Sequence, residues 1–417
     1  MARGRRLDRS FDVRAAGLEP RGRRFAQELT YGVVRMRGRL DHLLAQEVKG
    51  GLGRLDAKVL DVLRLGAFQL VRLDGVPDYA AVSATVDLAR TAGVGRASGL
   101  VNAVLRALLR NGTGLERFPS RDAEPVAHLS TWGSHPRWLV SRWIDAVGLE
   151  AAGDRIAMDN RVPPLGFVPL GPLDRAVADI AAAGGVARSA GRGSGALWVA
   201  GLDPRTLLAH VDGFVQDPGA ALVGRYAAPP EGAIVADLCA APGGKALYLA
   251  RTATYVLAAD PSAPRLALLR RNVDRTGLPV GVVRARAEAP PVAGVDLVLA
   301  DVPCTGTGTL RRHPDARWRL SPEEPARLAQ VQARLLHGIA RAVPHGGLLV
   351  YSTCSLETEE NEDRVGAFLD DHPDFRVEPP TGRELPDVGD DGYLRVLPER
   401  TGFDGAFAAR LRRGHRG

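Results

Sequence analysis

The second half of the chain, residues 231–417, alternates regularly between short apolar runs and segments with helical spacing. AIVADLCA, TYVLAAD, VDLVLADVP and GGLLVYSTCS have the apolar character of buried strands, and PRLALLRRNVDRTG is typical of a helix between two of them. This repeated order predicts an α/β fold with a doubly wound, mostly parallel sheet. Because ligands of such sheets bind at the carboxyl ends of the strands, the residues that follow each apolar run are candidates for a site.

The loop after the first of these strands has the composition of a nucleoside-binding turn. Asp237 ends the strand, and the small residues CAAPGG lead to Lys245 and a helix. Glycines let backbone amides approach a ligand closely, although the pattern is neither GxGxxG nor a phosphate-binding GxxxxGK[ST] loop. A structural glycine turn would explain this loop alone. Asp260 ends the next strand, where an acid suits ribose hydroxyls, and the two features together favour a nucleoside site.

Three cysteines, Cys239, Cys304 and Cys354, lie in small-residue turns of this half. Their odd number and wide spacing exclude a disulfide framework, and without a CxxC or Cys/His cluster we expect no metal site. Each thiol taken alone is more typical of a small buried side chain. However, Cys304 and Cys354 follow neighbouring strands beside Asp301, and Cys354 precedes a helix start, which lowers a thiol pKa. This arrangement favours a reactive pair.

Arginine is concentrated in two parts of the chain. One part follows the second cysteine and combines Trp318 with four candidate RNA-binding residues, namely Arg311, Arg312, His313 and Arg317. Such a segment fits phosphate contact and base stacking, although a salt-bridged surface loop would have the same composition. The other part, residues 1–40, holds 11 arginines against 4 acidic residues, a surplus equal to the formal net charge of +7 of the whole chain. A basic end of this kind suits nucleic acid, or an ordinary solvated surface.

The remainder of the chain predicts a multidomain protein. Apolar residues at helical spacing and almost no strand signal predict an all-α domain in residues 1–125, followed by a helical connector at 126–160. Short apolar runs around DRAVADIAAAGG predict a small α/β subdomain at 161–215. The α/β domain with the candidate site then occupies 216–417, and a length of 417 residues accommodates this division.

The sequence gives no sign of a membrane segment. No uncharged apolar run reaches the roughly 18 residues that a membrane-spanning helix requires. The basic N-terminal stretch is not followed by the apolar core of a secretory signal. The composition, 45% hydrophobic and 25% charged, is that of a globular protein. We therefore expect a cytoplasmic protein without a membrane partner, and nothing implies an obligatory protein partner.

Several of these segments resemble a known family. DLCAAPGGK, DVPCTGTGTLRRHPDARWR, YSTCSLETEENE and the terminal DGAFAARL are similar to the catalytic core of RNA cytosine-5 methyltransferases, specifically the ribosomal small-subunit methyltransferase B group. ELTYGVVRMRGRLD, RLGAFQL and GLVNAVLR resemble the NusB-type helical RNA-binding domain of that group. The resemblance covers nearly the whole chain. It implies an all-α NusB-like domain, a small RRM-like connecting subdomain and a Rossmann-like class I methyltransferase domain.

The resemblance also implies a reaction, in which S-adenosyl-L-methionine methylates carbon 5 of a cytosine in 16S rRNA, either naked or in an early small-subunit particle. Carbon 5 is a poor nucleophile, so a thiolate must first add to carbon 6. The family pattern gives this role to Cys354, makes Asp301 the general acid and lets Cys304 assist release of the enzyme. The resemblance assigns the cofactor to these residues: Cys239, Ala240, Ala241, Pro242, Gly243, Gly244, Lys245, Asp260 and Asp301.

Three positions depart from the family pattern. Arg286 and Ala287 stand where an aspartate usually contacts the adenine, with Glu288 as the available substitute. The usual opening helix of the NusB-like domain is not evident in residues 1–17, and PPLGFVPLG lacks a common asparagine. The altered adenine position leaves open a non-catalytic RNA-binding assembly factor.

The catalytic motifs are compatible with more than one enzyme. A tRNA cytosine-5 methyltransferase would share them, although the NusB-like part favours rRNA. The two cysteine roles could be reversed, because DNA cytosine-5 methyltransferases use the cysteine of their PC motif as nucleophile. A dinucleotide dehydrogenase fits the glycine pattern and the paired cysteines less well.

Overall fold

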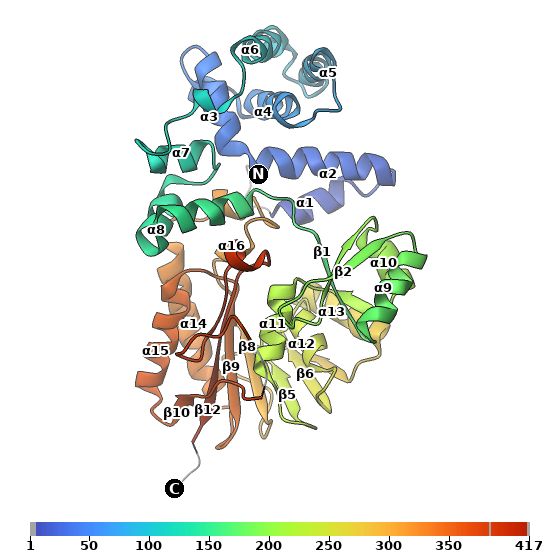
Figure 1. Cartoon of the computed structure of the whole chain (residues 1–417), viewed down its shortest axis with the longest axis vertical. Coiled ribbons are helices and arrows are strands. Elements are labelled where there is room, and N and C mark those ends of the chain that lie inside the picture. Colours follow the sequence, from blue (N-terminus) through green and yellow to red (C-terminus); the bar gives the residue numbers. More distant parts are fainter. Residues whose placement is uncertain (1–5, 383–384, 415–417) are drawn as a thin grey trace. The chain divides into compact units, whose positions relative to one another are not determined.

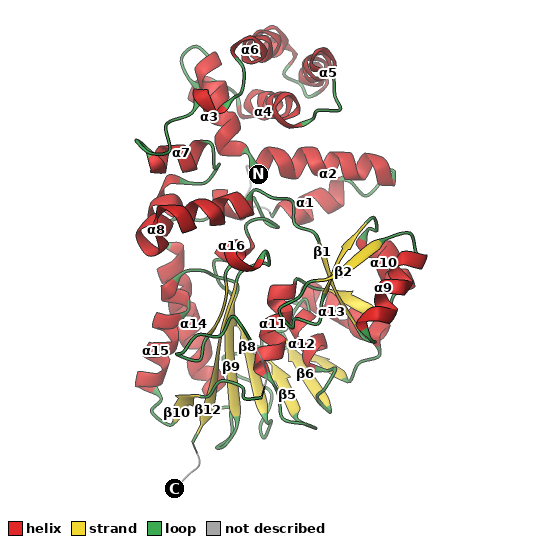
Figure 2. Ribbon diagram, viewed as in Figure 1, coloured by secondary structure: helices red, strands yellow, loops and turns green. Residues whose placement is uncertain are grey.

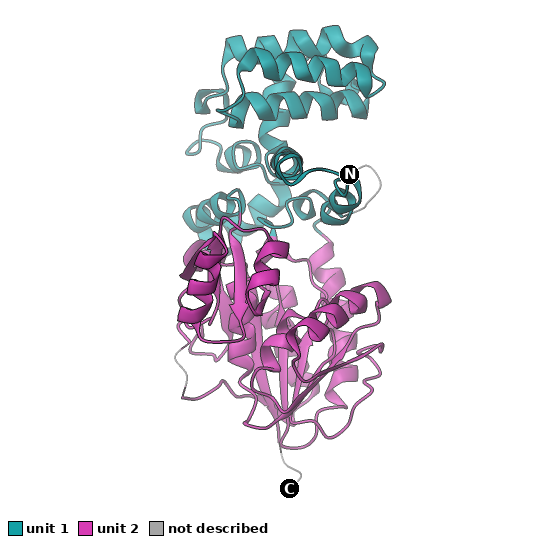
Figure 3. Cartoon of the chain, turned by 90° about the vertical axis from the view of Figure 1, so that its right-hand side faces the viewer, with its two compact units in different colours: residues 1–162, 310–322 teal, residues 163–309, 323–417 magenta. Residues whose placement is uncertain are grey.

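The computed structural model describes residues 6–382 and 385–414. The chain divides into two compact units, namely unit 1 with residues 1–162 and 310–322, and unit 2 with residues 163–309 and 323–417 (Figure 3). The described part of unit 1 is helical, and both sheets lie in unit 2 (Figures 1 and 2). The predicted fold class, a helical N-terminal domain and a Rossmann-like α/β domain, is confirmed.

The described part of unit 1 is built from helices, several of which share one apolar core. In chain order these are α1 (Leu7–Arg14), α2 (Pro20–Arg35), α3 (Arg37–Glu47), α4 (Ala57–Arg72), α5 (Asp78–Thr91), α6 (Ser98–Asn111), α7 (Pro125–Thr131) and α8 (Arg137–Asp159). Asp56 caps α4 by accepting a hydrogen bond from the Lys58 amide at 2.7 Å. Leu40, Leu63 and Leu105 are fully buried, so packing of α3, α4 and α6 accounts for the helical spacing of apolar residues.

The opening helix that is not evident in the sequence is present as α1. Leu7 and Phe11 are its buried residues, and the ring of Phe11 packs edge-on against Tyr31 with centroids 5.9 Å apart. The rest of LDRSFDVR is mostly charged or polar. Two buried apolar residues one turn apart are too few to give a clear helical period. The sequence pattern alone therefore could not predict this helix.

The longest helix in the described part of the chain is α8, with 23 residues. It bends at Gly148, whose φ of +82° lies in the left-handed region that glycine tolerates. Within residues 6–382 and 385–414, neither this helix nor any other is long and apolar enough to cross a membrane.

The chain returns to unit 1 for residues 310–322, which include the arginine-rich segment. The Leu7 amide donates to Asp315 Oδ2 at 3.2 Å. The Trp318 indole donates to the Val34 carbonyl at 2.8 Å. These bonds between distant parts of the sequence hold the segment against α1 and α2. The sequence pattern predicts residues 310–322 as part of the α/β domain at 216–417, whereas the structure groups them with unit 1.

The first part of unit 2 is a four-stranded antiparallel sheet with two helices. Its elements are β1 (Leu165–Pro169), α9 (Leu173–Ala182), β2 (Val186–Ser189), β3 (Leu197–Ala200), α10 (Pro204–His210) and β4 (Gly213–Val215). The strand order is β2-β3-β1-β4, as in a split βαβ unit. Phe167, Ile180, Leu197 and Leu207 join both helices to the sheet in one buried core.

The larger sheet of unit 2 follows the predicted alternation. Its elements are α11 (Pro218–Ala227), β5 (Ile234–Asp237), α12 (Gly244–Leu249), β6 (Tyr255–Ala259), α13 (Ala263–Thr276), β7 (Val280–Val283), β8 (Leu297–Asp301), α14 (Glu324–Ala340), β9 (Leu348–Thr353), α15 (Glu362–Asp371), β10 (Phe375–Val377), β11 (Leu394–Val396), α16 (Pro398–Thr401) and β12 (Ala406–Arg413). The strand order is β10-β12-β9-β8-β5-β6-β7, with β11 paired to β12. Strands β5 to β9 are parallel, and β12 adds antiparallel to β9. The order reverses between β5 and β8, where ligands of such sheets bind.

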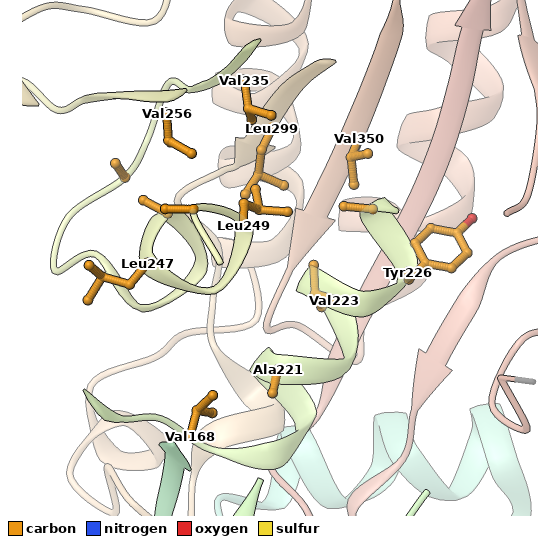
Figure 4. Packing of buried hydrophobic residues seen from close by; sticks show 14 of the residues in the cluster. Val168, Ala221, Val223, Tyr226, Val235, Leu247, Leu249, Val256, Leu299 and Val350 are labelled. Atoms are coloured by element: carbon orange, nitrogen blue, oxygen red, sulfur yellow. The ribbon is translucent and has the colours of Figure 1, made fainter. Parts of the chain in front are cut away.

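Helix α11 packs on this sheet through a large apolar cluster. Ala221, Val223 and Tyr226 of α11 belong to the same cluster as Val235 of β5 and Val350 of β9 (Figure 4). All five are fully buried, and the Tyr226 hydroxyl donates to the Gly392 carbonyl at 2.6 Å. This packing holds the central strands in place, so the strand ends that carry polar residues are supported by a rigid base.

Candidate active site

The polar residues singled out in the sequence meet at adjacent strand ends. Asp237 is the last residue of β5 and Asp301 the last of β8, and these two strands pair directly. On the other side of β8, Asp301 lies opposite Ser352 of β9, two residues before Cys354. The site therefore lies at the carboxyl ends of three neighbouring parallel strands, next to the point where the strand order reverses.

Three ionisable residues form what we call the acid cluster: Asp237, Lys245 and Asp301. The Lys245 ammonium donates to Asp301 Oδ2 at 2.8 Å, and the Ser352 hydroxyl donates to Asp301 Oδ1 at 2.8 Å. The Lys245 side chain is only 14% exposed and Asp301 30% exposed. The ion pair thus fixes the Asp301 carboxylate while leaving part of it open to a ligand.

The third member of the acid cluster, Asp237, is 1% exposed and short of partners. Its Oδ1 accepts from the Cys239 amide at 3.3 Å, while its Oδ2 is buried without a hydrogen-bond partner among the described residues. Burial, and then the charge of Asp301, raise the pKa of Asp237 to about 8, against the opposing charge of Lys245. A buried acceptor of this kind is satisfied when a ligand donates to it.

The cation of the acid cluster responds to the same surroundings. Burial would lower the pKa of Lys245, but the charge of Asp301, the hydrogen bond to it and the charge of Asp237 together raise it. Lys245 therefore stays charged, and it offsets one of the two carboxylates beside it.

The loop between β5 and α12 comes close to the sheet. Gly243 has a φ of +113°, and a Cβ on it would lie 2.2 Å from Leu269 Cδ1 of α13, so only glycine fits there. The peptide bond between Ala241 and Pro242 is cis. Burial and the neighbouring Asp237 raise the pKa of the Cys239 thiol, which therefore stays protonated and lines the loop.

Asp260 follows β6 and is 1% exposed. Its Oδ1 accepts from the Ser262 amide at 2.8 Å, and its Oδ2 lies 3.4 Å from the Arg265 guanidinium. The carboxylate is thus held by one amide and one arginine at the start of α13. These contacts orient the acid at the end of the strand next to β5.

Cys304 and Cys354 are brought together. Their Sγ atoms lie 3.3 Å apart, and the Cys354 amide also donates to Cys304 Sγ at 3.3 Å. The hydrogen bond with Cys354, followed by burial, raises the pKa of Cys304 well above the usual cysteine value. The proton therefore stays on Cys304, where it can be donated to the neighbouring sulfur.

A buried acid that sequence reasoning did not select lies behind the two cysteines. Glu360 is fully buried and binds Thr305, which follows Cys304, and Ser355, which follows Cys354. We call Cys304, Cys354, Thr305, Ser355 and Glu360 the thiol cluster. In the sequence Glu360 is one of several acids in ETEENE, so no local signal separates it from its exposed neighbours.

The arginine-rich segment is more enclosed than its composition predicts. Arg317 is fully buried, and its guanidinium donates to Asn160 Oδ1 at 2.9 Å and to the Asp159 carbonyl at 3.1 Å. Burial lowers the pKa of Arg317 to about 10. Arg311 is 2% exposed, whereas Arg312 and His313 are half-buried. In this conformation Arg317 binds the protein itself and offers no surface to a phosphate.

At the position expected to contact adenine, Ala287 is buried and the side chains on either side of it are exposed. Ala287 is 4% exposed, while Arg286 and Glu288 form an ion pair of 3.6 Å with side chains 78% and 44% exposed. A Cβ on Gly338 of α14 would lie 2.6 Å from the Glu288 carbonyl oxygen, so α14 packs closely on this backbone. Among the residues that the structure describes, no group of three or more His, Cys, Asp or Glu side chains could hold a metal ion.

Comparison with known proteins gives consistent matches over nearly the whole chain. A family model described as 16S rRNA methyltransferase RsmB/F matches residues 225–412, and the NusB family model matches residues 1–110. The ribosomal RNA small subunit methyltransferase B of Thermus thermophilus is 36% identical, with coverage of 98% of this chain and 92% of its own. A probable ribosomal RNA small subunit methyltransferase B of Bacillus subtilis is 32% identical, with coverage of 96% and 93%.

A solved structure has the same fold over a similar length. The crystal structure of PH0851 superposes with a TM-score of 0.79 at 26% sequence identity, covering 97% of this chain and 93% of the other. Both helical and α/β parts of the chain therefore have counterparts in one known protein.

Proposed function

Because this chain belongs to the 16S rRNA methyltransferase RsmB/F family, a family of S-adenosylmethionine-dependent methyltransferases, we propose that it methylates carbon 5 of a cytosine in 16S rRNA. The observation that carries this proposal is the pair of thiols at the ends of adjacent parallel strands, with sulfur atoms 3.3 Å apart beside Asp301. Methylation of a ring nitrogen or a ribose needs no thiol. Methylation of cytosine carbon 5 does, because that carbon must first gain electron density.

In the proposed first step, the Cys354 thiolate adds to carbon 6 of the cytosine. The electron pair of the 5,6 double bond then makes carbon 5 a nucleophile, and carbon 5 takes the methyl group. S-adenosylmethionine supplies that methyl group on a sulfonium, which makes it readily transferable. The S–H of Cys304 is placed to donate to Cys354 Sγ, which supports Cys354 as the sulfur that carries the negative charge.

Asp301 is proposed as the acid that holds the ring nitrogen N3 and the exocyclic amine. The Lys245 and Ser352 bonds fix both of its oxygens, and 30% of the side chain is exposed for a base to approach. A proton held at N3 offsets the charge that develops on the ring when the thiolate adds. Asp301 would serve in this way only if the target cytosine is extruded from its stack, as other base-modifying enzymes require.

In the last step, Cys304 first loses its own proton to solvent and is then proposed to take the proton from carbon 5. The electron pair of that C–H bond re-forms the 5,6 double bond, the bond between carbon 6 and Cys354 breaks with its electron pair returning to Cys354 as a thiolate, and N3 returns its proton to the Asp301 carboxylate. The main factor that raises the pKa of Cys304 is its hydrogen bond with Cys354. Bonding of Cys354 to carbon 6 removes the charge that this hydrogen bond stabilises. Formation of the adduct thus removes the largest cause of the raised pKa of Cys304, while burial continues to raise it, so Cys304 loses its proton more easily in the adduct than before.

The cofactor is proposed to bind the loop Cys239–Lys245 and the acid of β6. The unpartnered Oδ2 of Asp237 suits the ammonium group of a methionine moiety, and Gly243, whose φ of +113° favours glycine, gives the loop the turn that leads to α12. Asp260 would hold the ribose hydroxyls. These features fit S-adenosylmethionine, and Asp301 would contact both cofactor and base.

The proposed partner is 16S rRNA, naked or in an early small-subunit particle, in the cytoplasm. The NusB family match over residues 1–110 and the 11 arginines of residues 1–40 support an RNA-docking role for the helical part. Arg312 and His313 remain candidates for RNA contact because they are only half-buried. For Arg311 and Arg317, contact with RNA would require the buried side chains to leave their present places.

The test is to incubate the protein with methyl-labelled S-adenosylmethionine and unmodified 16S rRNA, and then to digest the RNA and identify the labelled nucleoside. We expect the label in 5-methylcytidine. Label in tRNA but not in rRNA would favour a tRNA enzyme. If tRNA, 16S rRNA and the assembled subunit all stay unlabelled, the protein is a non-catalytic assembly factor, and calorimetry should then show no cofactor binding.

A further inference from the structure

We infer that Glu360 is a positioning residue that holds the Cys304 loop and the Cys354 loop together. Its carboxylate lies between the two loops and accepts hydrogen bonds from the residue that follows each cysteine. The consequence for catalysis rests on the proposed function. The positional claim itself concerns only the distance between two sulfur atoms, so it can be tested without RNA or cofactor.

The Glu360 carboxylate is fully used by donors from three elements. Oε1 accepts from the Thr305 amide at 2.9 Å and from Gln332 Nε2 of α14 at 2.9 Å. Oε2 accepts from the hydroxyl of Thr305 and, at 2.5 Å, from the hydroxyl of Ser355. The two hydroxyls also lie within 3.0 Å of each other. One carboxylate therefore connects both cysteine loops to α14.

These donors are all neutral, which distinguishes Glu360 from an ordinary buried ion pair. The side chain is 0% exposed, and burial raises its pKa while the bonds from Ser355, Thr305 and Gln332 lower it. Hydrogen bonds to a charged acceptor are about twice as strong as those between neutral groups. An anion held by four neutral donors keeps each donor in place, so displacing either loop breaks a strong bond.

Further buried bonds hold Glu360 and Gln332 in place. The Tyr351 hydroxyl of β9 lies 3.1 Å from Gln332 Oε1 and 2.5 Å from the Glu360 carbonyl oxygen. Gln332 Nε2 also donates to the Pro303 carbonyl at 3.0 Å, on the other side of Cys304 from Thr305. The residues on both sides of Cys304 are thus held by the side chains of Gln332 and Glu360, and Tyr351 binds the Gln332 side chain and the Glu360 main chain.

Several bonds connect the loops without Glu360, and they define the competing explanation. They include the bond from the Cys354 amide to Cys304 Sγ and the contact between the Thr305 and Ser355 hydroxyls. The Gly308 amide donates to the Cys354 carbonyl at 2.9 Å, and the Leu356 amide donates to Thr307 Oγ1 at 2.9 Å. If these bonds alone set the sulfur positions, removal of the Glu360 carboxylate would leave the thiols where they are. The two explanations differ in what happens to the thiols of a folded Glu360 variant.

The experiment compares Glu360→Ala, Glu360→Gln and the control Asp387→Asn in the full-length protein. Asp387 is an acid of unit 2 whose side chain is 8% exposed and pairs with Arg192 instead of the cysteine loops. Each protein is treated with diamide, which accepts two hydrogens from two thiols as they form a disulfide. The rate at which Cys304 and Cys354 become linked is followed by alkylation and peptide mass. Thermal unfolding and cofactor binding are measured on the same samples.

We expect Glu360→Ala to slow this disulfide formation by about tenfold or more, because the effective concentration of two held thiols falls steeply when they are displaced. Glu360→Gln should restore the rate to within about threefold of the wild type, since its amide oxygen accepts from Thr305 N and Gln332 while its amide group donates to the two hydroxyls. Methyl transfer should follow the same order through kcat, with cofactor affinity unchanged. The Asp387→Asn rate should equal that of the wild type.

A wild-type rate of disulfide formation in Glu360→Ala would overturn the inference. If Glu360→Ala does not fold, the same rate is measured on Ser355→Ala, which removes one of the four bonds to the Glu360 carboxylate. A wild-type rate of disulfide formation in Ser355→Ala would also overturn the inference. If the wild-type protein transfers no methyl group but the thiol rates follow the expected order, the proposed function fails and the positional role of Glu360 stands.

Discussion

The acid cluster and the thiol cluster lie at neighbouring strand ends of unit 2, but they accommodate buried charge in different ways. In the acid cluster, the cation Lys245 pairs with Asp301 and is also influenced by the charge of Asp237, and Asp237 keeps an oxygen without a partner among the described residues. In the thiol cluster, the carboxylate of Glu360 is held by neutral donors, and each of these donors is part of the scaffold. The first arrangement is incomplete without a ligand, whereas the second is complete by itself.

Because of this difference, we expect the two clusters to have different roles. An unsatisfied buried acceptor can be relieved by a ligand that donates to it, so the acid cluster is built to change on binding. A fully satisfied network is rigid, so the thiol cluster is suited to hold reactive atoms at a fixed distance. Asp301 connects the two, because Ser352 of β9 donates to it and Cys354 comes directly after Thr353, the last residue of β9.

The strongest way to break the thiol cluster is to remove a sulfur. We expect Cys354→Ala to lower kcat by about 10⁴-fold or more, as for loss of other enzyme nucleophiles, and to form no covalent complex with RNA. Cys304→Ala should instead accumulate a covalent complex, because the adduct forms but is not resolved. Denaturing gel electrophoresis of protein with labelled rRNA separates the two results.

The contrary pattern would reverse the two cysteine roles. Activity retained in Cys354→Ala, combined with a Cys304→Ala protein that is inactive without trapping RNA, would make Cys304 the nucleophile. Asp387→Asn provides the control, because Asp387 pairs with Arg192 and has no contact with either cysteine loop among the bonds of the described residues. It should form and resolve the RNA complex as the wild type does.

A substitution at Asp301 tests whether the clusters act together. We expect Asp301→Asn to lower kcat by about 10²- to 10⁴-fold, the range typical for loss of a general acid. The double variant with Cys304→Ala should trap little RNA, because addition to carbon 6 needs the proton at N3. Ser352→Ala leaves Lys245 in place and should cost only about tenfold, the effect of one hydrogen bond to a charged group. Equal losses in the two variants would show that Asp301 acts only through its orientation.

The acid cluster can be tested by the pH dependence of stability. The pKa of Asp237 is about 8 in the folded protein and 3.8 for an ordinary aspartate. The folded protein therefore holds a proton that the unfolded chain has lost between these values. The stability linked to this proton is complete below pH 3.8 and is lost as the pH rises through about 8. Without ligand, the unfolding free energy should therefore fall over this range.

Asp237→Asn should remove that decline. Relative to the wild type, the variant should gain about 4 kcal/mol between pH 5 and pH 9, because the wild type loses about 1.4 kcal/mol for each pH unit between pH 5 and the folded pKa of about 8. Urea unfolding at both pH values gives the measurement, with the exposed Asp174→Asn on α9 as control. A difference that is the same at both pH values would mean that Asp237 does not titrate in this range. The variant should also bind the cofactor more weakly.

The features of the site that could be predicted from the sequence depend on local patterns, whereas those that could not depend on contacts between distant parts of the chain. The strand ends at Asp237, Asp260 and Asp301 were predictable because apolar runs and turns are local patterns. The roles of Glu360 and Arg317 were not, because each depends on partners far along the chain, such as Gln332 for Glu360 and Asn160 for Arg317. An acid or an arginine in a polar run has the same local signal whether it is exposed or buried.

The adenine position should give the smallest effect. It follows β7, which β6 separates from β5 of the acid cluster, and its ion pair is exposed instead of buried. Glu288 is 44% exposed, and its 3.6 Å pair with Arg286 is an exposed one. Such pairs contribute about 0–1 kcal/mol, so Glu288→Ala should leave stability nearly unchanged. If the Glu288 carboxylate accepts from the adenine amine, cofactor affinity in calorimetry should fall by about two- to fivefold, as for one partly solvated hydrogen bond. Arg286→Ala should not weaken binding, because it removes only the exposed partner. Equal affinities in all three proteins would mean that backbone groups held by α14 bind the adenine instead of a side chain.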